Sequence, residues 1–263
     1  FMEATSFNSD LSGWDVSNVR DMRAMFPGTP FNGDISKWDV SRVSSMSYMF
    51  IRAASFNSDL SGWDVSSVTE ISFMFMHTKS FNGDLSKWDV SSAKDMSGMF
   101  SEISFNGDIS NWDVSSVTDM TGLFSETSFD GDLSKWDVSR VINMRGMFHQ
   151  AVAFKSDISK WDVSSVTNMA GMFLYAEVFN GDISKWDVSS VTEMKGMFAA
   201  AEMFNGDLSK WYVSSVINMN QMFNGAKEFN SDISKWDVSR VADMGRMFDL
   251  TDSFNVDISK WDV

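Results

Sequence analysis

The residues best suited to chemistry in this sequence are aspartates that recur every 24 or 25 residues. One column follows a phenylalanine by three positions and comprises Asp10, Asp34, Asp59, Asp84, Asp108, Asp132, Asp157, Asp182, Asp207, Asp232 and Asp257. A second column follows the tryptophans and comprises Asp15, Asp39, Asp64, Asp89, Asp113, Asp137, Asp162, Asp187, Asp237 and Asp262. The two columns hold 21 of the 36 acidic residues. Aligned carboxylates can bind a cation or hold a turn, so their role depends on what positions them.

For the first column we expect a structural role. A serine follows each of these aspartates by two residues, and an aspartate in a turn accepts hydrogen bonds from backbone N–H groups one or two residues on. The alternative is a cation shared between neighbouring repeats. Calcium is the candidate because it takes six to eight oxygen ligands, but the usual calcium-binding β-roll nonapeptide is absent. Calcium is therefore not favoured, and we expect no cofactor.

The second column lies two residues after a column of lysines. We expect both to point outward from a short strand, where lysine and aspartate can neutralise one another across strands. This face is either solvated and self-compensated or a regular charged surface that meets a partner. As a candidate partner-binding face, called the Lys–Asp face below, we take Lys37, Asp39, Asp64, Lys87, Asp89, Asp113, Lys135, Asp137, Lys160, Asp162, Lys185, Asp187, Lys235 and Asp237. Tyr212 interrupts the aspartate column, so no single repeat behaves like a catalytic site.

Other catalytic patterns have no support in the sequence. The two histidines, His77 and His149, lie in variable segments of different repeats and form no recognisable triad with a serine and an aspartate. There is no cysteine, no glycine-rich phosphate loop and no histidine-based zinc motif. A glycosidase carboxylate pair is singular and asymmetric, whereas these aspartates recur in every repeat. We expect a protein that is not an enzyme.

The elements that must position these residues follow from the repeat itself. All eleven tryptophans occupy the same place in a unit that residues 179–203 illustrate. A fixed period of 20 to 50 residues indicates a solenoid or a propeller. The spacing of two in Lys-Trp-Asp-Val-Ser predicts a strand, and the spacing of three to four in Met-x-x-Met-Phe predicts a helical or 3-10 turn. Eight of the ten residues before the first methionine are Asp, Asn or Ser, which favour helix N-termini.

The predicted fold is therefore an α/β solenoid with one short parallel strand and one short helical or 3-10 turn per repeat. We expect a single unit over residues 1–263, with about 10–11 repeats spaced about 4.8 Å apart along the sheet. Tryptophan, valine and methionine should face the core, and an exposed tryptophan platform for glycans is the alternative. The chain begins and stops in mid-repeat, at Phe1 and Val263, so we interpret it as a window on a longer array.

The composition of the chain argues against several classes of binding partner. The net charge of −15 argues against nucleic acid and against anionic membrane surfaces. No run of 18 apolar residues is present, so we expect no membrane span in this chain. The segment after each Met-Phe varies in length and sequence, which is typical of a surface loop.

The spacing from Ile183 to Ala201, Ile-x-x-Trp-x-Val-x-x-Val-x-x-Met-x-x-x-Phe-x-x-Ala, resembles the BspA-type leucine-rich repeats. Within them it is most similar to the Phe-Asn-x-Asp-Ile-Ser-x-Trp-Asp-Val-Ser variant, a bacterial surface-protein repeat. The resemblance covers the whole chain and implies a curved, leucine-rich-repeat-like solenoid without catalytic residues. It also implies an extracellular or cell-surface location.

From the resemblance and the residues together we expect a non-catalytic module for protein binding, adhesion or scaffolding. A purely structural spacer or filament subunit that self-associates is one alternative. Calcium-assisted binding of a glycan or a mineral surface by the aspartate columns is another.

Overall fold

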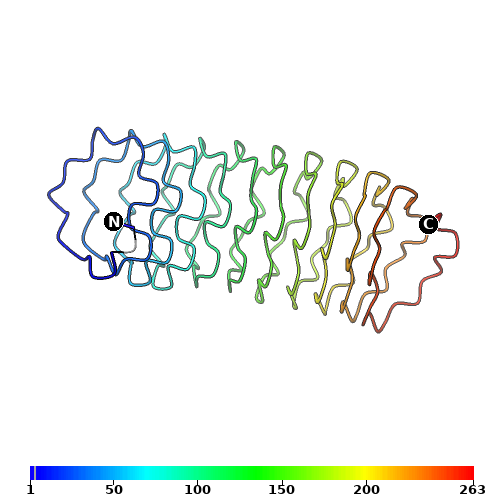
Figure 1. The fold of residues 1–263 in the computed structure, drawn as a ribbon. Helices are drawn as coiled ribbons and strands as arrows, with labels where there is room; N and C mark the ends of the chain where they lie inside the picture. Colours follow the sequence, from blue (N-terminus) through cyan, green and yellow to red (C-terminus); the bar gives the residue numbers. More distant parts are fainter. Residues whose placement is uncertain (3) are drawn as a thin grey trace.

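The computed structural model describes residues 1–2 and 4–263 and shows a chain wound into successive coils, stacked side by side from one terminus to the other (Figure 1). Each coil corresponds to one repeat, so equivalent residues of successive repeats lie next to one another. The parallel bridges between residues 24 or 25 positions apart document this register along the chain.

Regular secondary structure in the described residues consists of single-residue parallel bridges. They join the residue before the first methionine of each repeat to its equivalent in the next, through Asp21, Ser45, Glu70, Asp95, Asp119, Asn143, Asn168, Glu193, Asn218 and Asp243. The predicted strand over residues 37–41 is not assigned, and the parallel contact lies instead at Ser45. The described residues also contain no helix, so the predicted helical or 3-10 turn at Met-x-x-Met-Phe is wrong.

The backbone hydrogen bonds explain why this segment is not helical. The N–H groups of Met46, Tyr48 and Phe50 donate to carbonyls of the next coil at 2.9, 2.9 and 3.0 Å. The intervening Met49 N–H donates back to the Met46 carbonyl at 3.1 Å, and Ala53 donates to Phe50 at 2.9 Å. In a helix, the N–H groups beyond the first turn donate to carbonyls four residues back in the same segment. Here every second N–H joins neighbouring coils, and the others close four-residue turns.

These turns place two residues per coil in the left-handed backbone region. The first set is Ala24, Tyr48, Phe73, Gly98, Gly122, Gly146, Gly171, Gly196, Gln221 and Arg246. The second set is Gly28, Arg52, His77, Glu102, Glu126, Gln150, Tyr175, Ala200, Gly225 and Leu250. Both sets occupy the third position of a turn, where a type II turn requires a positive φ and favours glycine. The glycines between the methionines are thus explained by backbone conformation.

The Asp and Asn residues predicted to cap helices accept the expected hydrogen bonds from backbone N–H groups, but they do so in turns. Asp95 Oδ1 accepts the Ser97 N–H at 2.9 Å, and Asn168 Oδ1 accepts the Ala170 N–H at 3.0 Å. Such local bonds from Asp and Asn stabilise turns as well as helix N-termini. These side chains therefore hold the chain where it turns away from the bridge.

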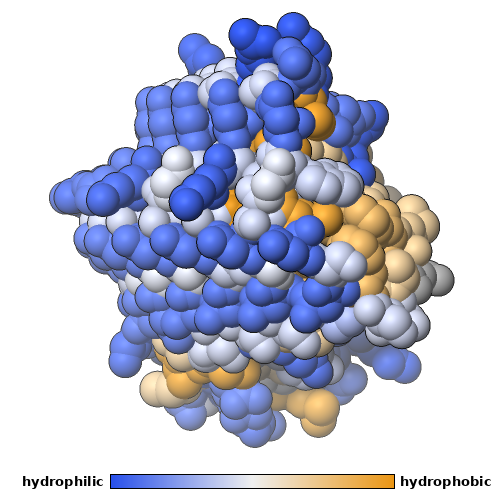
Figure 2. Space-filling model, turned by 90° about the vertical axis from the view of Figure 1, so that its left-hand side faces the viewer, coloured by the Kyte–Doolittle hydropathy of each residue, from blue (hydrophilic) through white to orange (hydrophobic). Residues whose placement is uncertain are grey.

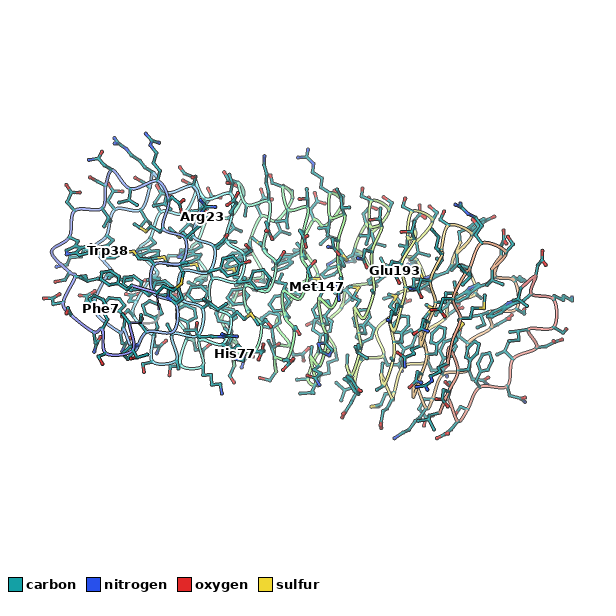
Figure 3. The ribbon with its side chains drawn as sticks, viewed as in Figure 1. Phe7, Arg23, Trp38, His77, Met147 and Glu193 are labelled. Carbon is teal, nitrogen blue, oxygen red and sulfur yellow. The ribbon has the colours of Figure 1, made fainter. Side chains whose placement is uncertain are left out.

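The core is continuous along the stack, and Trp38 and Met147 lie inside the coils (Figure 3). Trp38 is 4% exposed and Val40 1% exposed, as expected for inward-facing residues. Two columns of stacked phenylalanines run beside them. Phe148 lies 3.8 Å from Phe154, six residues on, and 5.6 Å from Phe173, its equivalent in the next coil, measured between ring centroids. This spacing exceeds the roughly 4.8 Å between hydrogen-bonded strands.

The tryptophans also join the coils by hydrogen bonds. The indole N–H of Trp136 donates to the Ile109 carbonyl of the preceding coil at 3.1 Å, and the backbone N–H of Trp112 donates to the same carbonyl at 3.1 Å. The bond recurs for Trp38, Trp63, Trp88, Trp112, Trp136, Trp161, Trp186, Trp211, Trp236 and Trp261. A glycan platform made of exposed tryptophans is therefore wrong for the interior coils, because the rings are buried.

Candidate functional site

All fourteen residues of the Lys–Asp face are exposed. They alternate with buried neighbours, since Trp136 and Val138 point into the core while Lys135 and Asp137 point outward. Repetition aligns equivalent residues, and Figure 2 shows parallel rows of hydrophilic residues along the body. The expected outward orientation is therefore confirmed, although it arises without an assigned strand.

The aspartates of this face are held by their own backbone. In each one the Oδ1 atom accepts the N–H of the serine two residues on, at 3.0–3.2 Å, as at Asp39, Asp64, Asp89, Asp113, Asp137, Asp162, Asp187 and Asp237. The hydrogen bonds from the Ser139 hydroxyl and N–H lower the pKa of Asp137, and those from Ser189 lower the pKa of Asp187.

The predicted charge pairing across this face is not observed. Within the described residues, the contacts under 4.0 Å between basic and acidic side chains are Arg23–Asp21, His77–Glu102, which is ionic when the histidine is protonated, and Lys227–Glu202; none involves the Lys–Asp face. The carboxylates of this face bond instead to the serines of their own turns. The lysines of the face are left exposed to solvent.

The first aspartate column confirms its predicted structural role. All eleven members accept the N–H of the serine two residues on at 2.9–3.0 Å. The Ser36 hydroxyl, followed by its N–H, holds the pKa of Asp34 below its ordinary value. The part of the chain that the structure describes brings together no group of three or more His, Cys, Asp or Glu residues suited to a metal ion.

Sequence reasoning missed a column of asparagines that also joins the coils. Asn32 Oδ1 accepts the Asn57 N–H at 2.8 Å, and Asn205 Oδ1 accepts the Asn230 N–H at 2.9 Å. Because a side chain here satisfies a backbone N–H of the next coil, the bond stabilises the stack. The signal was available, since an asparagine follows the first phenylalanine in nine of the eleven repeats.

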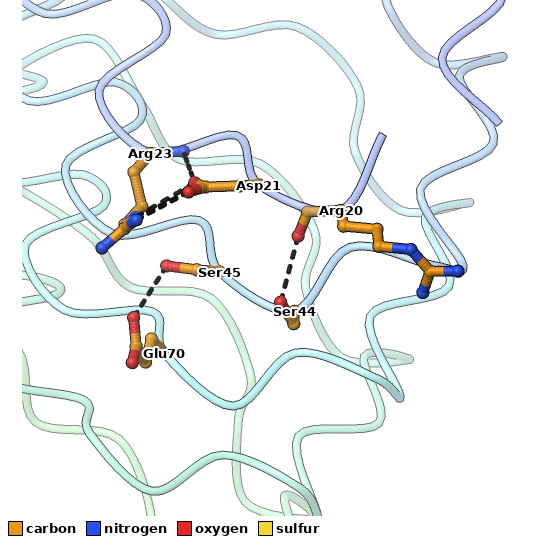
Figure 4. A network of polar contacts seen from close by, with 6 residues as sticks. All are labelled: Arg20, Asp21, Arg23, Ser44, Ser45 and Glu70. Atoms are coloured by element: carbon orange, nitrogen blue, oxygen red, sulfur yellow. Dashed lines mark hydrogen bonds and ion pairs between the residues drawn. The ribbon is translucent and has the colours of Figure 1, made fainter. Parts of the chain in front are cut away.

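A polar network lies beside the bridges near the N-terminal end (Figure 4). Arg23 forms a two-pronged ion pair with Asp21, with 2.7 Å between Nη2 and Oδ2. Ser45 Oγ donates to Glu70 Oε2 of the next coil at 3.0 Å. Side-chain contacts between bridge residues recur at Asn143–Asp119 and Asn218–Glu193, and the sequence pattern did not predict them.

The variable loops form an open groove of about 520 Å³ whose lining includes Glu102, Glu126, Gln150 and Tyr175. Its walls come from successive repeats, so the least regular part of the unit also presents a concave surface. Burial lowers the pKa of His149 near this groove.

Comparison with protein-family models identifies a match to the family described as "Mycoplasma protein of unknown function, DUF285". The matches cover residues 1–106, 102–211 and 179–263. The chain belongs to this family. In general terms this is the BspA-like repeat family that the sequence resembles. Comparisons with curated proteins and with solved structures gave no match.

The DUF285 chain thus consists of repeats over its whole length, and the Lys–Asp face presents exposed charged residues of both signs along them. No helix among the described residues has the length and apolar character that crossing a bilayer requires. Tyr212 is the exception within the regular face. It stands where the other coils carry aspartate, and its side chain is 75% exposed.

Proposed function

We propose that this DUF285 chain is a non-catalytic repeat module that binds a protein partner and serves in adhesion or scaffolding. The proposal includes an extracellular or cell-surface location, membership of the leucine-rich-repeat-like solenoids, and kinship with the Phe-Asn-x-Asp-Ile-Ser-x-Trp-Asp-Val-Ser variant. Its main support is the Lys–Asp face, in which fourteen exposed charged residues recur in register.

The arrangement suits multivalent contact. Each aspartate is already oriented by its serine, so it loses little conformational freedom when a partner binds. Each coil repeats the same pair of charges, and the contacts of several coils add along one rigid body. No coil is indispensable in such a surface, which is consistent with the interruptions at Gly62, Asn111 and Tyr212.

The test removes charge without removing the turn. Asp137→Asn, Asp162→Asn and Asp187→Asn keep an oxygen that can accept the serine N–H, and Lys135→Gln, Lys160→Gln and Lys185→Gln remove the adjacent cations. Proteins captured from cell-surface preparations by the immobilised chain are identified, and the binding of one purified partner is then measured by biolayer interferometry. Affinity should fall progressively as the six changes accumulate.

Asp132→Asn, Asp157→Asn and Asp182→Asn are the matched control, because they change the neighbouring aspartate column in the same coils. Unchanged affinity after all six changes would remove the Lys–Asp face as the binding surface. Self-association of the isolated chain in light scattering would favour the spacer or filament alternative. A rise in melting temperature at millimolar calcium would favour the calcium-assisted alternative.

A further inference from the structure

Tyr212 interrupts a pattern that every neighbouring coil obeys. In the preceding coil, Asp187 Oδ1 accepts the Ser189 N–H at 3.0 Å, and in the following coil Asp237 Oδ1 accepts the Ser239 N–H at 3.2 Å. The coil between them has Tyr212 at the aspartate position and keeps the serine, Ser214. Among the described residues, no side chain of the protein accepts a hydrogen bond from the Ser214 N–H.

The surroundings of Ser214 are suited to an anion. An open groove of about 390 Å³ is lined by Ser214, Lys210, Lys235, Tyr212 and also Asp237, whose carboxylate already accepts the Ser239 N–H. A second groove on the other side of the tyrosine is lined by Lys185, Asp187 and again by Lys210 and Tyr212, and the Asp187 carboxylate already accepts the Ser189 N–H. The tyrosine also removes one negative charge from this coil. Lys210 and Lys235 therefore line the same groove as Ser214. In the coils on either side, the equivalent serine N–H groups donate to a carboxylate.

We propose that the groove at Tyr212 binds a carboxylate of a partner peptide, an Asp or Glu side chain that takes the place of the aspartate missing from this coil. The carboxylate accepts the Ser214 N–H and hydroxyl as the protein's own aspartates do at Ser189 and Ser239. Lys210 and Lys235 contribute charge, and Tyr212 packs against an apolar residue next to the acidic one.

A peptide fits these features because of the exposed tyrosine. An aromatic ring with 75% of its surface exposed is unfavourable on a face otherwise made of charged residues, and tyrosine is enriched among the residues that dominate protein interfaces. The hydrogen-bond geometry to be reproduced is that of an aspartate side chain, which the neighbouring coils supply as templates. The inference rests on the proposed function and specifies the partner chemistry at one coil of the face.

The three tyrosines of the chain, Tyr48, Tyr175 and Tyr212, allow a direct test. The chain is labelled with 3-fluorotyrosine, and the ¹⁹F signal of residue 212 is assigned from the Tyr212→Phe variant. A capped Ala-Asp-Leu peptide should shift this signal and leave the other two in place. The matched Ala-Asn-Leu peptide, which lacks the charge on the acceptor, and the Lys210→Gln variant, which lacks a cation of the groove, should each weaken binding about tenfold.

A gain-of-site variant keeps the inference testable whatever the native affinity. Asp187→Tyr recreates the arrangement of Tyr212 one coil earlier, with Ser189 as the donor. It should add a fourth ¹⁹F signal that also responds to the Asp peptide.

Equal binding of the Asn peptide, or no response of Tyr212 to the Asp peptide, would overturn the inference. If the Tyr212 signal responded to glucuronate and not to the peptide, the ligand would be an acidic glycan and the proposed peptide would be wrong. These outcomes are measured on chains that carry none of the six changes of the Lys–Asp face, two of which, at Lys185 and Asp187, line the second groove. The test of this site and the test of the proposed function can therefore fail separately.

Discussion

Glycine and alanine occupy equivalent left-handed positions in the same coil, at Gly196 with φ 59° and Ala200 with φ 54°. A Cβ atom added at Gly196 would meet only the Ala199 Cβ at 3.9 Å, which is an ordinary contact. Gly196→Ala should therefore lower the free energy of unfolding by about 1 kcal/mol through backbone conformation alone. Urea denaturation of the full chain measures this difference.

The matched control is Ala200→Gly. Because Ala200 occupies the equivalent position, removal of its Cβ relieves the same strain, so Ala200→Gly should raise the unfolding free energy by a comparable amount, about 1 kcal/mol. If Gly196→Ala left the unfolding midpoint unchanged, the left-handed turn would not be a source of strain in this repeat.

The aspartates show at the residue level what the sequence could predict. A serine two residues after each aspartate was enough to predict the bond at Asp34, because that contact lies within one turn of chain. The same local rule applied to Asp39, where cross-strand pairing with lysine was predicted instead. An exposed ion pair contributes only about 0.2–1 kcal/mol and must order two long side chains. The nearby backbone donor is therefore the stronger competitor.

At the scale of the element, the indole N–H distinguishes tryptophan from the other large apolar residues, because it can donate a hydrogen bond from within the core. Trp136 is 3% exposed and donates to Ile109 of the preceding coil. Trp136→Phe keeps an aromatic ring but loses the bond and some volume, so the unfolding free energy should fall by about 1–2 kcal/mol. Chemical denaturation followed by fluorescence of the remaining tryptophans measures the change.

Trp14 offers a control of the same residue type. Its side chain is 48% exposed, and its indole N–H has no acceptor within the described part of the chain. Trp14→Phe should change the unfolding free energy by less than about 0.5 kcal/mol. Equal losses for the two variants would contradict a role for the bond between coils.

The helical turn was predicted but is absent, and the reason is physical and belongs to the same scale. Apolar residues three and four apart are compatible with a helical turn and equally with consecutive type II turns. A segment as short as Met46–Phe50 gains too little from helical propagation to decide between them. Hydrogen bonds to the next coil favour the turns over a helix, and the sequence of a single repeat does not reveal these bonds. The inward-facing Trp38 and Met46 were predictable because either local structure buries them.

For the whole molecule, the near-identity of the coils predicts tolerance to loss of one complete repeat. Deletion of residues 180–204 joins Phe179 to Asn205, which restores the Phe-Asn junction of the repeat. Since stability in such arrays is a sum of units and their interfaces, the shortened chain should stay folded with a modestly lower melting temperature. Deletion of residues 180–191 removes about half a repeat and breaks the register, so it should abolish cooperative melting. Comparable melting of both variants would contradict a stack of equivalent coils.

Acidification tests the largest electrostatic feature of the molecule. Eighteen aspartates have pKa values below their ordinary range, mainly because serine hydroxyl and N–H groups donate to the charged carboxylate. A carboxyl whose pKa is lower when folded stabilises the protein above its unfolded pKa, and this contribution is lost as the pH falls through the folded value. Melting temperature should therefore change little between pH 7 and 5 and fall steeply below about pH 4.

A competing effect has the opposite sign. The chain carries a net charge of −15, and neighbouring aspartates such as Asp34 and Asp84 raise the pKa of Asp59. If repulsion dominated, protonation would relieve it and the melting temperature would rise between pH 5 and 3. The serine bonds are the larger cause at Asp59, so we expect the fall. Asp132→Asn, Asp157→Asn and Asp182→Asn keep the acceptor oxygen without a titrating group, and the combined variant should lose less stability below pH 4 than the parent chain.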